Sequence, residues 1–389
     1  MISIGKSQCE DGEIDLGWGN CNYIYGENYN VAPNGCMPSG CFSIEETISL
    51  DFSYIQLGIF PANIGELENL SYVHISDCGI TGEIPSEIGN LINLNWLWIY
   101  DNGVSENFPD SLGVQINSNL SGNIPIEIEN LTNLENINLR GNSLTGEIPL
   151  GISNLENLSS LDLSRNQLSG EIPLELMNSS NLTGLILSEN YLTGQIPEEI
   201  GNLENLDVLD INSNQFTGEI PNNIGSLDSL LWLSLSNNQL VGEIPIEIIN
   251  LDRVYFLDLS YNELSGAIPI GIENLDLAYF RLNNNNLSGY ISEELCDIYS
   301  VDLSYNKFCP EYPECLSQEE LGIQYTLDCN NQDYCDINSD GNINVLDVIL
   351  VVNCVIDDGW CDNICMDYNE DSLVNVLDII LMINIIISS

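Results

Sequence analysis

Two segments near the C-terminus carry oxygen-bearing side chains at a spacing that suits a metal ion. Residues 336–347 (DINSDGNINVLD) and 367–378 (DYNEDSLVNVLD) share the pattern D-x-N-x-D-x-x-x-N-x-x-D. Side-chain oxygens at loop positions 1, 3, 5, 9 and 12, with a main-chain carbonyl at position 7, form a cage that the hard cation Ca²⁺ prefers. We therefore expect two calcium sites. Their ligands are Asp336, Asn338, Asp340, Asn344 and Asp347 with the carbonyl of Asn342, and Asp367, Asn369, Asp371, Asn375 and Asp378 with the carbonyl of Leu373.

Each loop runs into an apolar segment that we expect to be a helix, residues 345–356 and 376–387. Both segments are apolar almost all round, which is more than two helices of a small module can bury against each other. The sequence therefore indicates a partner surface for this module, or self-association through these helices. The alternative is that the module packs on the rest of its own chain as an additional cap.

The rest of the chain is organised by a repeat of 24 residues. The frame L-x-x-L-x-L-x-x-N-x-L, followed by G-x-I-P, ends at Asn142, Asn166, Asn190, Asn214, Asn238 and Asn262. In the first of these coils Ile137 and Leu139 point from a short strand into a core, whereas Asn138 and Arg140 point to solvent. A buried asparagine amide can satisfy backbone groups that the turn leaves unpaired, so the repeats predict a stacked asparagine ladder. The glycine and proline predict a turn and a second, weaker strand.

This pattern resembles the plant-type leucine-rich repeats of receptor ectodomains and polygalacturonase-inhibitor-like proteins. The matching text includes NLTNLENINLRGNSLTGEIPLGI from Asn130 and NLENLDVLDINSNQFTGEIPNNI from Asn202, and the resemblance extends over about residues 50–306. It implies an α/β repeat solenoid, a horseshoe with a parallel β-sheet on its concave face. It also implies binding of peptides, proteins or glycans, without saying which.

The C-terminal loops resemble a type I dockerin, because Asp stands at position 12 and no helix enters either loop. That resemblance implies a small α-helical module that docks on a cohesin-like domain. The loop positions 10 and 11, which often carry small polar recognition residues in dockerins, are Val345, Leu346, Val376 and Leu377 in this chain. The second loop also departs from the first, with Ser372 in place of Gly341 at a position that needs an unusual backbone conformation.

Aromatic side chains are expected on the concave face, where residues from successive strands form columns. One group comprises Tyr72, His74, Trp96, Trp98 and Tyr100, and a second comprises Trp232, Phe256 and Tyr279, with Tyr255 and Tyr261 close by. Exposed rings suit a sugar ring, an apolar peptide or another protein. The alternative is that the rings only pack side by side on the pleated surface. Arg140 and Arg165 form either a small cationic spot or ion pairs with nearby acids.

The balance of charges excludes several classes of function. Six Lys and Arg oppose 59 Asp and Glu, which gives a formal charge of −53 that repels nucleic acids and anionic bilayers.

No apolar run reaches the length of a membrane span. His74 is the only histidine, and no nucleophile motif occurs, so we expect no enzyme.

Thirteen cysteines indicate an oxidising, extracellular compartment. Twelve fall into three even groups: Cys9, Cys21, Cys36 and Cys41; Cys296, Cys309, Cys315 and Cys329; Cys335, Cys354, Cys361 and Cys365. The thirteenth, Cys78, stands at a ladder position and is expected to be a buried thiol. We expect a disulfide-bearing N-terminal cap (1–49), the solenoid (50–306), a C-terminal cap with linker (307–333) and the dockerin-like module (334–389).

One irregularity interrupts the repeats. Between Asn102 and Asn119 the spacing falls to 17 residues, which is too short for a full coil. It is either a degraded or deleted repeat that bulges without consequence or a kink that shapes a binding site.

Together these features predict a secreted, non-catalytic binding or adhesion protein. It would recognise a protein or glycan on its concave face and dock through the calcium-dependent module to a cohesin-like partner. Two alternatives are a structural subunit of an extracellular filament, coat or surface layer, and an accessory subunit of a polysaccharide-degrading complex.

Removal of calcium tests the C-terminal module in the full chain. Three aspartates in each loop repel one another until a divalent cation neutralises them, so a chelator should unfold residues 336–387 and leave the solenoid folded. Calorimetric titration of calcium into the chelated chain should show two sites. The tighter should be lost in Asp336→Ala, because Ser372 in the other loop costs about 1 kcal/mol of backbone strain. An absence of calcium binding would refute both sites.

Overall fold

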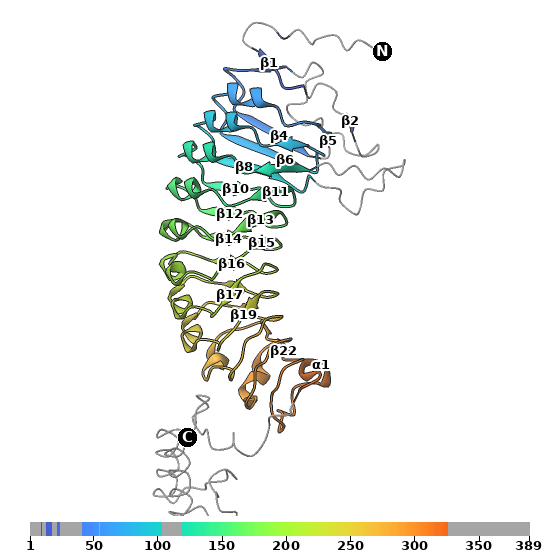
Figure 1. Cartoon of the computed structure of the whole chain (residues 1–389), viewed down its shortest axis with the longest axis vertical. Helices are drawn as coiled ribbons and strands as arrows, with labels where there is room; N and C mark the ends of the chain where they lie inside the picture. The colour runs from blue at the N-terminus through green and yellow to red at the C-terminus, as the bar shows by residue number, and fades with distance from the viewer. Residues whose placement is uncertain are drawn as a thin grey trace, which may run out of the picture.

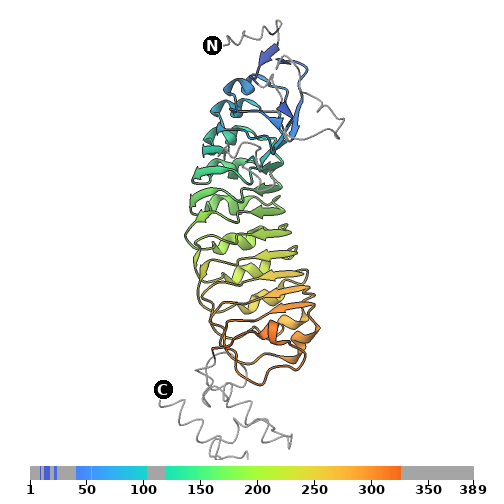
Figure 2. The same cartoon turned by 90° about the vertical axis from the view of Figure 1, so that its right-hand side faces the viewer.

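The computed structural model describes residues 9, 13–17, 22–23, 41–53, 55–102 and 119–325. Over these residues the chain coils into an elongated, gently bowed solenoid with its first and last coils at opposite ends (Figure 1, Figure 2). Both predicted calcium loops and the four docking residues of the dockerin-like module lie outside the described residues. Within the described ranges, no helix has the length and apolar character that a membrane crossing needs.

One face of the solenoid is a parallel sheet of eleven strands, called the main sheet here. Its strands are β4 (Ser49–Ser53), β6 (Tyr72–Ser76), β8 (Trp96–Tyr100), β10 (Asn136–Asn138), β12 (Ser160–Asp162), β14 (Gly184–Ile186), β16 (Val208–Asp210), β18 (Trp232–Ser234), β20 (Phe256–Asp258), β21 (Tyr279–Arg281) and β22 (Ser300–Asp302). Each strand pairs with the strand one coil away, so equivalent residues form straight columns. The parallel sheet expected from the sequence is confirmed.

The predicted second strand is present in most coils. It comprises β7 (Gly82–Glu83), β9 (Leu120–Asn123), β11 (Ser143–Gly146), β13 (Gln167–Gly170), β15 (Tyr191–Leu192), β17 (Thr217–Gly218) and β19 (Gln239–Leu240). The first five of these form one sheet, and β17 pairs with β19. The turn glycine has φ near 80° in coil after coil, as at Gly146 and Gly170, a conformation that only glycine adopts without strain.

The remaining side of each coil is a short 3₁₀-helix instead of the α-helix of many α/β folds. These helices are η1 (Ala62–Glu66), η2 (Ser86–Asn90), η3 (Ile126–Asn130), η4 (Leu150–Asn154), η5 (Leu174–Asn178), η6 (Glu198–Asn202), η7 (Asn222–Ser226), η8 (Ile246–Asn250), η9 (Ile272–Asn274) and η10 (Glu293–Asp297). In Figure 1 they stack along the left-hand edge. A 24-residue coil leaves few residues for this side, and the tighter 3₁₀ turn spans the distance with five or fewer.

The core is a single column of Leu, Ile and Phe side chains that runs through the stacked coils. Ile137, Leu139 and their equivalents are fully buried, as the repeat frame predicts. Each coil therefore buries its apolar side only against its neighbours, which is why a solenoid needs caps at its ends.

The predicted asparagine ladder is confirmed. The side-chain nitrogen of Asn190 donates to the carbonyls of Leu187 and Ser188 in its own coil and of Leu163 in the preceding coil, at 3.0–3.2 Å. Its side-chain oxygen accepts the amide N–H of Leu168, also in the preceding coil, at 3.0 Å. One amide thus closes a turn and fastens it to its neighbour.

Cys78 occupies the same position in its coil and is fully buried. Its thiol donates to the carbonyl of Ser76, two residues earlier, just as Asn102 donates to Tyr100. The sequence-based prediction of a buried thiol in the ladder is confirmed.

The 17-residue spacing suggested a shortened coil, but the structure shows that this coil is complete. β8 pairs directly with β10, and Trp96 faces Asn136, which is 40 residues further along the chain. The coil therefore has its normal 24 residues and an insertion of 16 (40 − 24), which contains residues 103–118. Asn119 is not a ladder residue: it donates to the Ser143 hydroxyl, and β9 begins directly after it.

The ladder is incomplete beside this insertion. The side-chain oxygen of Asn142 is buried and accepts no hydrogen bond from the described part of the chain. In regular coils the donor is the amide 22 residues earlier, as with Leu144 and Asn166. The equivalent residue here is Leu120, where the chain returns from the insertion.

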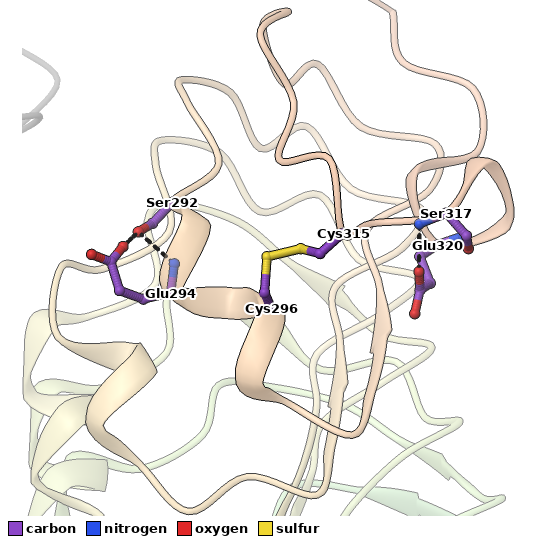
Figure 3. The surroundings of a disulfide bond; sticks show 6 residues. All are labelled: Ser292, Glu294, Cys296, Cys315, Ser317 and Glu320. Carbon is purple, nitrogen blue, oxygen red and sulfur yellow. Dashed lines mark hydrogen bonds between the residues drawn. A yellow bond between two sulfur atoms is a disulfide. The ribbon is translucent and has the colours of Figure 1, made fainter.

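Disulfides and capping side chains close the described ends. Cys9 pairs with Cys41, next to the antiparallel pair β1 (Glu13–Asp15) and β3 (Cys41–Ser43), and β2 (Asn22–Tyr23) pairs with β5 (Ile55–Gln56). At the other end, Cys296 of η10 pairs with Cys315, just before the short α1 (Gln318–Leu321) (Figure 3). Figure 3 also shows Ser292 and Ser317, which cap η10 and α1. The expected disulfides within the terminal cysteine groups are confirmed for these two pairs.

A ladder asparagine with all its hydrogen bonds should contribute more to the free energy of unfolding than Asn142, which lies beside the insertion. Asn190→Ala leaves several buried groups unpaired, each at a cost of about 1–3 kcal/mol, so we expect a loss of roughly 2–4 kcal/mol in the free energy of unfolding. Asn142→Ala should cost about 1 kcal/mol less, since no residue of the described ranges donates to its side-chain oxygen. Denaturant titration of both variants measures the difference. Equal losses would contradict this account of the insertion.

Candidate functional site

The residues predicted to face a ligand lie on the outward face of the main sheet, the face that is expected from the sequence to be concave. Along β6 and β8 the side chains alternate between buried and half-buried, so Val73 and Leu97 enter the core while Tyr72, His74, Trp96 and others face outward. All eight predicted contact residues lie on outward positions of main-sheet strands. The ladder sets these columns in register.

The first five of them form one cluster, the N-terminal cluster, made of Tyr72, His74, Trp96, Trp98 and Tyr100. Ring centroids lie 5.1 Å apart for Trp96 and Trp98, 5.9 Å for His74 and Trp98, and 6.2 Å for Tyr72 and Trp98. Trp98 is at the centre, and most neighbouring rings meet it at steep angles, the preferred edge-to-face geometry. The rings hold one another in place and present a contiguous apolar surface that is partly open to solvent.

His74 links this cluster to a carboxylate. Its Nδ1 lies 2.8 Å from an oxygen of Asp51, and its Nε2 lies 3.2 Å from the Tyr100 hydroxyl. In the neutral ring, Nδ1–H donates to the carboxylate and the Tyr100 O–H donates to Nε2. Burial, followed by the negative charge of Asp51, raises the pKa of Tyr72. One imidazole nitrogen thus meets a carboxylate and the other a phenol, which fixes the orientation of the ring within the cluster.

The two arginines singled out from the sequence behave differently. Arg165 pairs with Glu189 at 2.8 Å, which matches the ion-pair alternative. The backbone of Arg140 joins the coil of the N-terminal cluster, because its carbonyl accepts the Asp101 amide. The Nε of Arg140 is buried and has no hydrogen-bond acceptor within the described ranges.

The second aromatic group, the C-terminal stack, is built on Trp232, Phe256 and Tyr279. Trp232 and Phe256 lie face to face, 3.6 Å apart and nearly parallel, and Tyr279 follows at 5.9 Å. The Arg281 guanidinium lies 5.7 Å above the Phe256 ring. These contacts leave Phe256 only 7% exposed. Phe256 therefore supports the neighbouring rings and offers no surface of its own to a ligand, unlike the contact residue expected from the sequence.

A ring that sequence reasoning missed extends this stack. Tyr299 is 83% exposed and packs edge-on against Tyr279. Tyr299 was missed in the sequence because the last coils are shorter than 24 residues, so that counting in steps of 24 does not reach it. Its column could have been found by aligning it with Tyr255, which also flanks the stack.

A hollow of about 530 Å³ lies beside the C-terminal stack. Its lining includes Arg281, Tyr261, Tyr299, Asp258, Asp302 and Glu320. Arg281 is 3.8 Å from Asp258, and carboxylates predominate around it. This end of the outward face is therefore aromatic and acidic.

One cluster of potential metal ligands occurs in the described part of the chain, Cys9, Glu13 and Cys41. Since Cys9 and Cys41 form a disulfide, their sulfurs cannot serve as thiolate ligands. The two calcium sites remain predictions, because their residues fall outside the described ranges.

The comparisons with known proteins concern the coils. The family profile described as Leucine Rich Repeat matches residues 69–91, 133–155, 157–179, 181–203, 205–227, 229–251 and 253–275. No curated protein matches the chain. The solved structures similar to it include the plant peptide hormone receptor RGFR1 in complex with RGF2, at 33% identity over 67% of this chain and 48% of that chain, with a TM-score of 0.52.

Two further structures are similar over most of the solenoid. A plant ice-binding protein shares 32% identity over 64% of this chain and 77% of its own, with a TM-score of 0.54. The structure of PEPR1-AtPEP1 shares 31% identity over 70% of this chain and 44% of that chain, with a TM-score of 0.53. The chain spans about half the length of RGFR1 and PEPR1.

Proposed function

The chain belongs to the leucine-rich-repeat proteins, and on this premise we propose that it is a non-catalytic binding protein for a peptide or protein. The ligand lies on the outward face of the main sheet. The observation that carries this proposal is the N-terminal cluster, in which two tryptophans and their neighbours present an apolar surface on adjacent coils. Water solvates such a surface poorly, so covering it with a partner makes the free energy of binding more favourable.

The similar structures support a polypeptide ligand. RGFR1 is a plant peptide hormone receptor in complex with RGF2, and it matches two thirds of this chain. The outward face is also long and open, which suits an extended chain that runs across several coils. A glycan stacked on the tryptophans is the second class of ligand that the same rings could hold.

The ligand should be cationic or neutral. The chain carries a formal charge of −53, and the columns of the outward face include Asp51, Asp162, Asp210 and Asp258. Burial raises the pKa of Asp210, and the nearby Asp162 adds to that effect. A basic ligand would relieve this repulsion and would be steered toward the face.

The finer parts of the proposal concern the protein's setting. The disulfides Cys9–Cys41 and Cys296–Cys315 suit an extracellular compartment. We propose that the C-terminal module binds two calcium ions and docks on a cohesin-like partner, so that the solenoid is displayed at a surface or scaffold. The repeated loop pattern supports this assignment.

Ice binding is the activity named for one similar structure, and the second-strand side of the coils carries regularly spaced hydroxyls. Thr193 and Thr217, one coil apart, donate to the carbonyls of Gly170 and Gly194. The neighbouring column, however, is exposed and acidic, with Glu171 and Glu219 among its members. Strongly hydrated carboxylates in this column work against adsorption to ice. We therefore favour peptide or protein binding.

Replacement of the two tryptophans tests the proposed function. Trp96 and Trp98 pair with Asn136 and Asn138 on β10, so asparagine is compatible with these positions. The double variant Trp96→Asn, Trp98→Asn should keep its circular dichroism spectrum and lose at least about 100-fold in affinity, ~2.7 kcal/mol, for ligands selected from a displayed peptide library.

A glycan panel run beside the library separates the two ligand classes. Arg253→Gln, an exposed change away from the cluster, serves as the control and should bind as the wild type does. If the selected ligands bind the tryptophan variant and the wild type equally well, the N-terminal cluster is only a packing feature and the proposal fails.

A further inference from the structure

A second surface of the solenoid carries exposed apolar side chains. In most coils a proline precedes the 3₁₀-helix, and one residue follows this proline directly. From Pro125 onward this residue is Ile126, Leu150, Leu174, Glu198, Asn222, Ile246 and Ile270. Ile246 is 51% exposed and Ile270 is 62% exposed, on two adjacent coils. The fold does not require an apolar residue here, because Glu198 and Asn222 occupy the same position in the intervening coils.

Ile246 and Ile270 border a hollow of about 760 Å³. Its apolar lining also includes Ile244, Pro245, Ala267 and Pro269. Ala267 stands where the preceding coils have Glu219 and Glu243. In those coils the glutamate side chain lies closely against the turn glycine of the next coil, as Glu243 does at Gly266, whereas Gly289 has only the Ala267 methyl nearby. Because Ala267 replaces the longer glutamate, space opens at the same place where Ile246 and Ile270 are exposed.

The rim of this hollow is acidic. Glu219, Glu243 and Glu247 line it, and none of its lining residues is Lys or Arg. An occupant must therefore combine apolar groups with positive charge. A second copy of this chain, with its charge of −53, would be repelled.

We propose that this hollow, the lateral hollow, docks a segment of a basic partner polypeptide whose aliphatic side chains lie between Ile246 and Ile270 and whose Lys or Arg residues meet the surrounding glutamates. The volume suits a few side chains, within the range of ordinary ligand pockets. The surface is built from the second-strand and 3₁₀ sides of the coils, so it is separate from the outward face of the main sheet. The protein would then hold two partners at once.

The probe is a short synthetic peptide in which leucine alternates with lysine, with a twin in which glutamate replaces lysine. Calorimetry on the full chain should show binding of the lysine peptide and none of the glutamate peptide. The variant Ile246→Glu, Ile270→Asn carries the residue types that Glu198 and Asn222 have at the same position of their coils. Its circular dichroism spectrum should therefore match that of the wild type. The variant should bind the lysine peptide at least about tenfold more weakly, equivalent to ~1.4 kcal/mol.

The matched control is Leu150→Glu, the same position four coils earlier, which should bind as the wild type does. Unchanged affinity in the Ile246→Glu, Ile270→Asn variant overturns the proposal, as does equal binding of the two peptides. If the tryptophan variant of the main sheet loses the lysine peptide while the lateral-hollow variant keeps it, the peptide occupies the main sheet, and only the lateral hollow is refuted. If light scattering shows wild-type assembly that this variant abolishes, the occupant is a second copy and the proposed partner is wrong.

Discussion

The structure depends on the way one asparagine amide is used in most of its coils. Its nitrogen closes the turn after each main-sheet strand, and its oxygen accepts an N–H from the preceding coil, so the same side chain shapes one coil and attaches it to the next. These groups are buried, where an unpaired partner is costly, and the spacing of the coils is therefore fixed. Because the coils are in register, every outward position becomes part of a column, and residues 24 apart in the sequence become neighbours.

This arrangement separates folding from recognition. The inward residues and the ladder define the solenoid, and the outward residues are free to vary from coil to coil. The chain uses that freedom unevenly: rings gather at β6 and β8 and again from β18 to β21, whereas the outward positions of the strands between them have no aromatic ring and include Asp162 and Asp210. The same freedom on the lateral side places Ala267, where preceding coils have glutamate, beside the exposed Ile246 and Ile270. Binding surfaces on this scaffold are thus departures from the average repeat, and they can be found by asking which coils differ.

Much of the fold follows from the sequence, because a repeated frame reports each buried position many times. The inward leucines, the ladder, the second strand and the buried Cys78 were all predictable in this way. The insertion was not, since Asn119 and the following Leu-Ser-Gly imitate the end of an ordinary frame. The burial of Phe256 was also hidden, because it depends on how closely Trp232 stacks on it. Tyr299 was missed because it requires the register of the shortened coils, and the lateral hollow was missed because it depends on alanine in place of glutamate at position 267.

The central claim is that the buried asparagines hold the coils together, and hydrogen exchange of single amides in the native full chain tests it directly. The amides of Leu144, Leu168 and Leu192 donate to asparagine oxygens of the following coil. The account predicts that they exchange only through the opening that also exposes main-sheet amides such as those of Leu161 and Leu185, with similar protection. If they exchange as fast as exposed turn amides while the main sheet stays protected, the ladder does not join the coils.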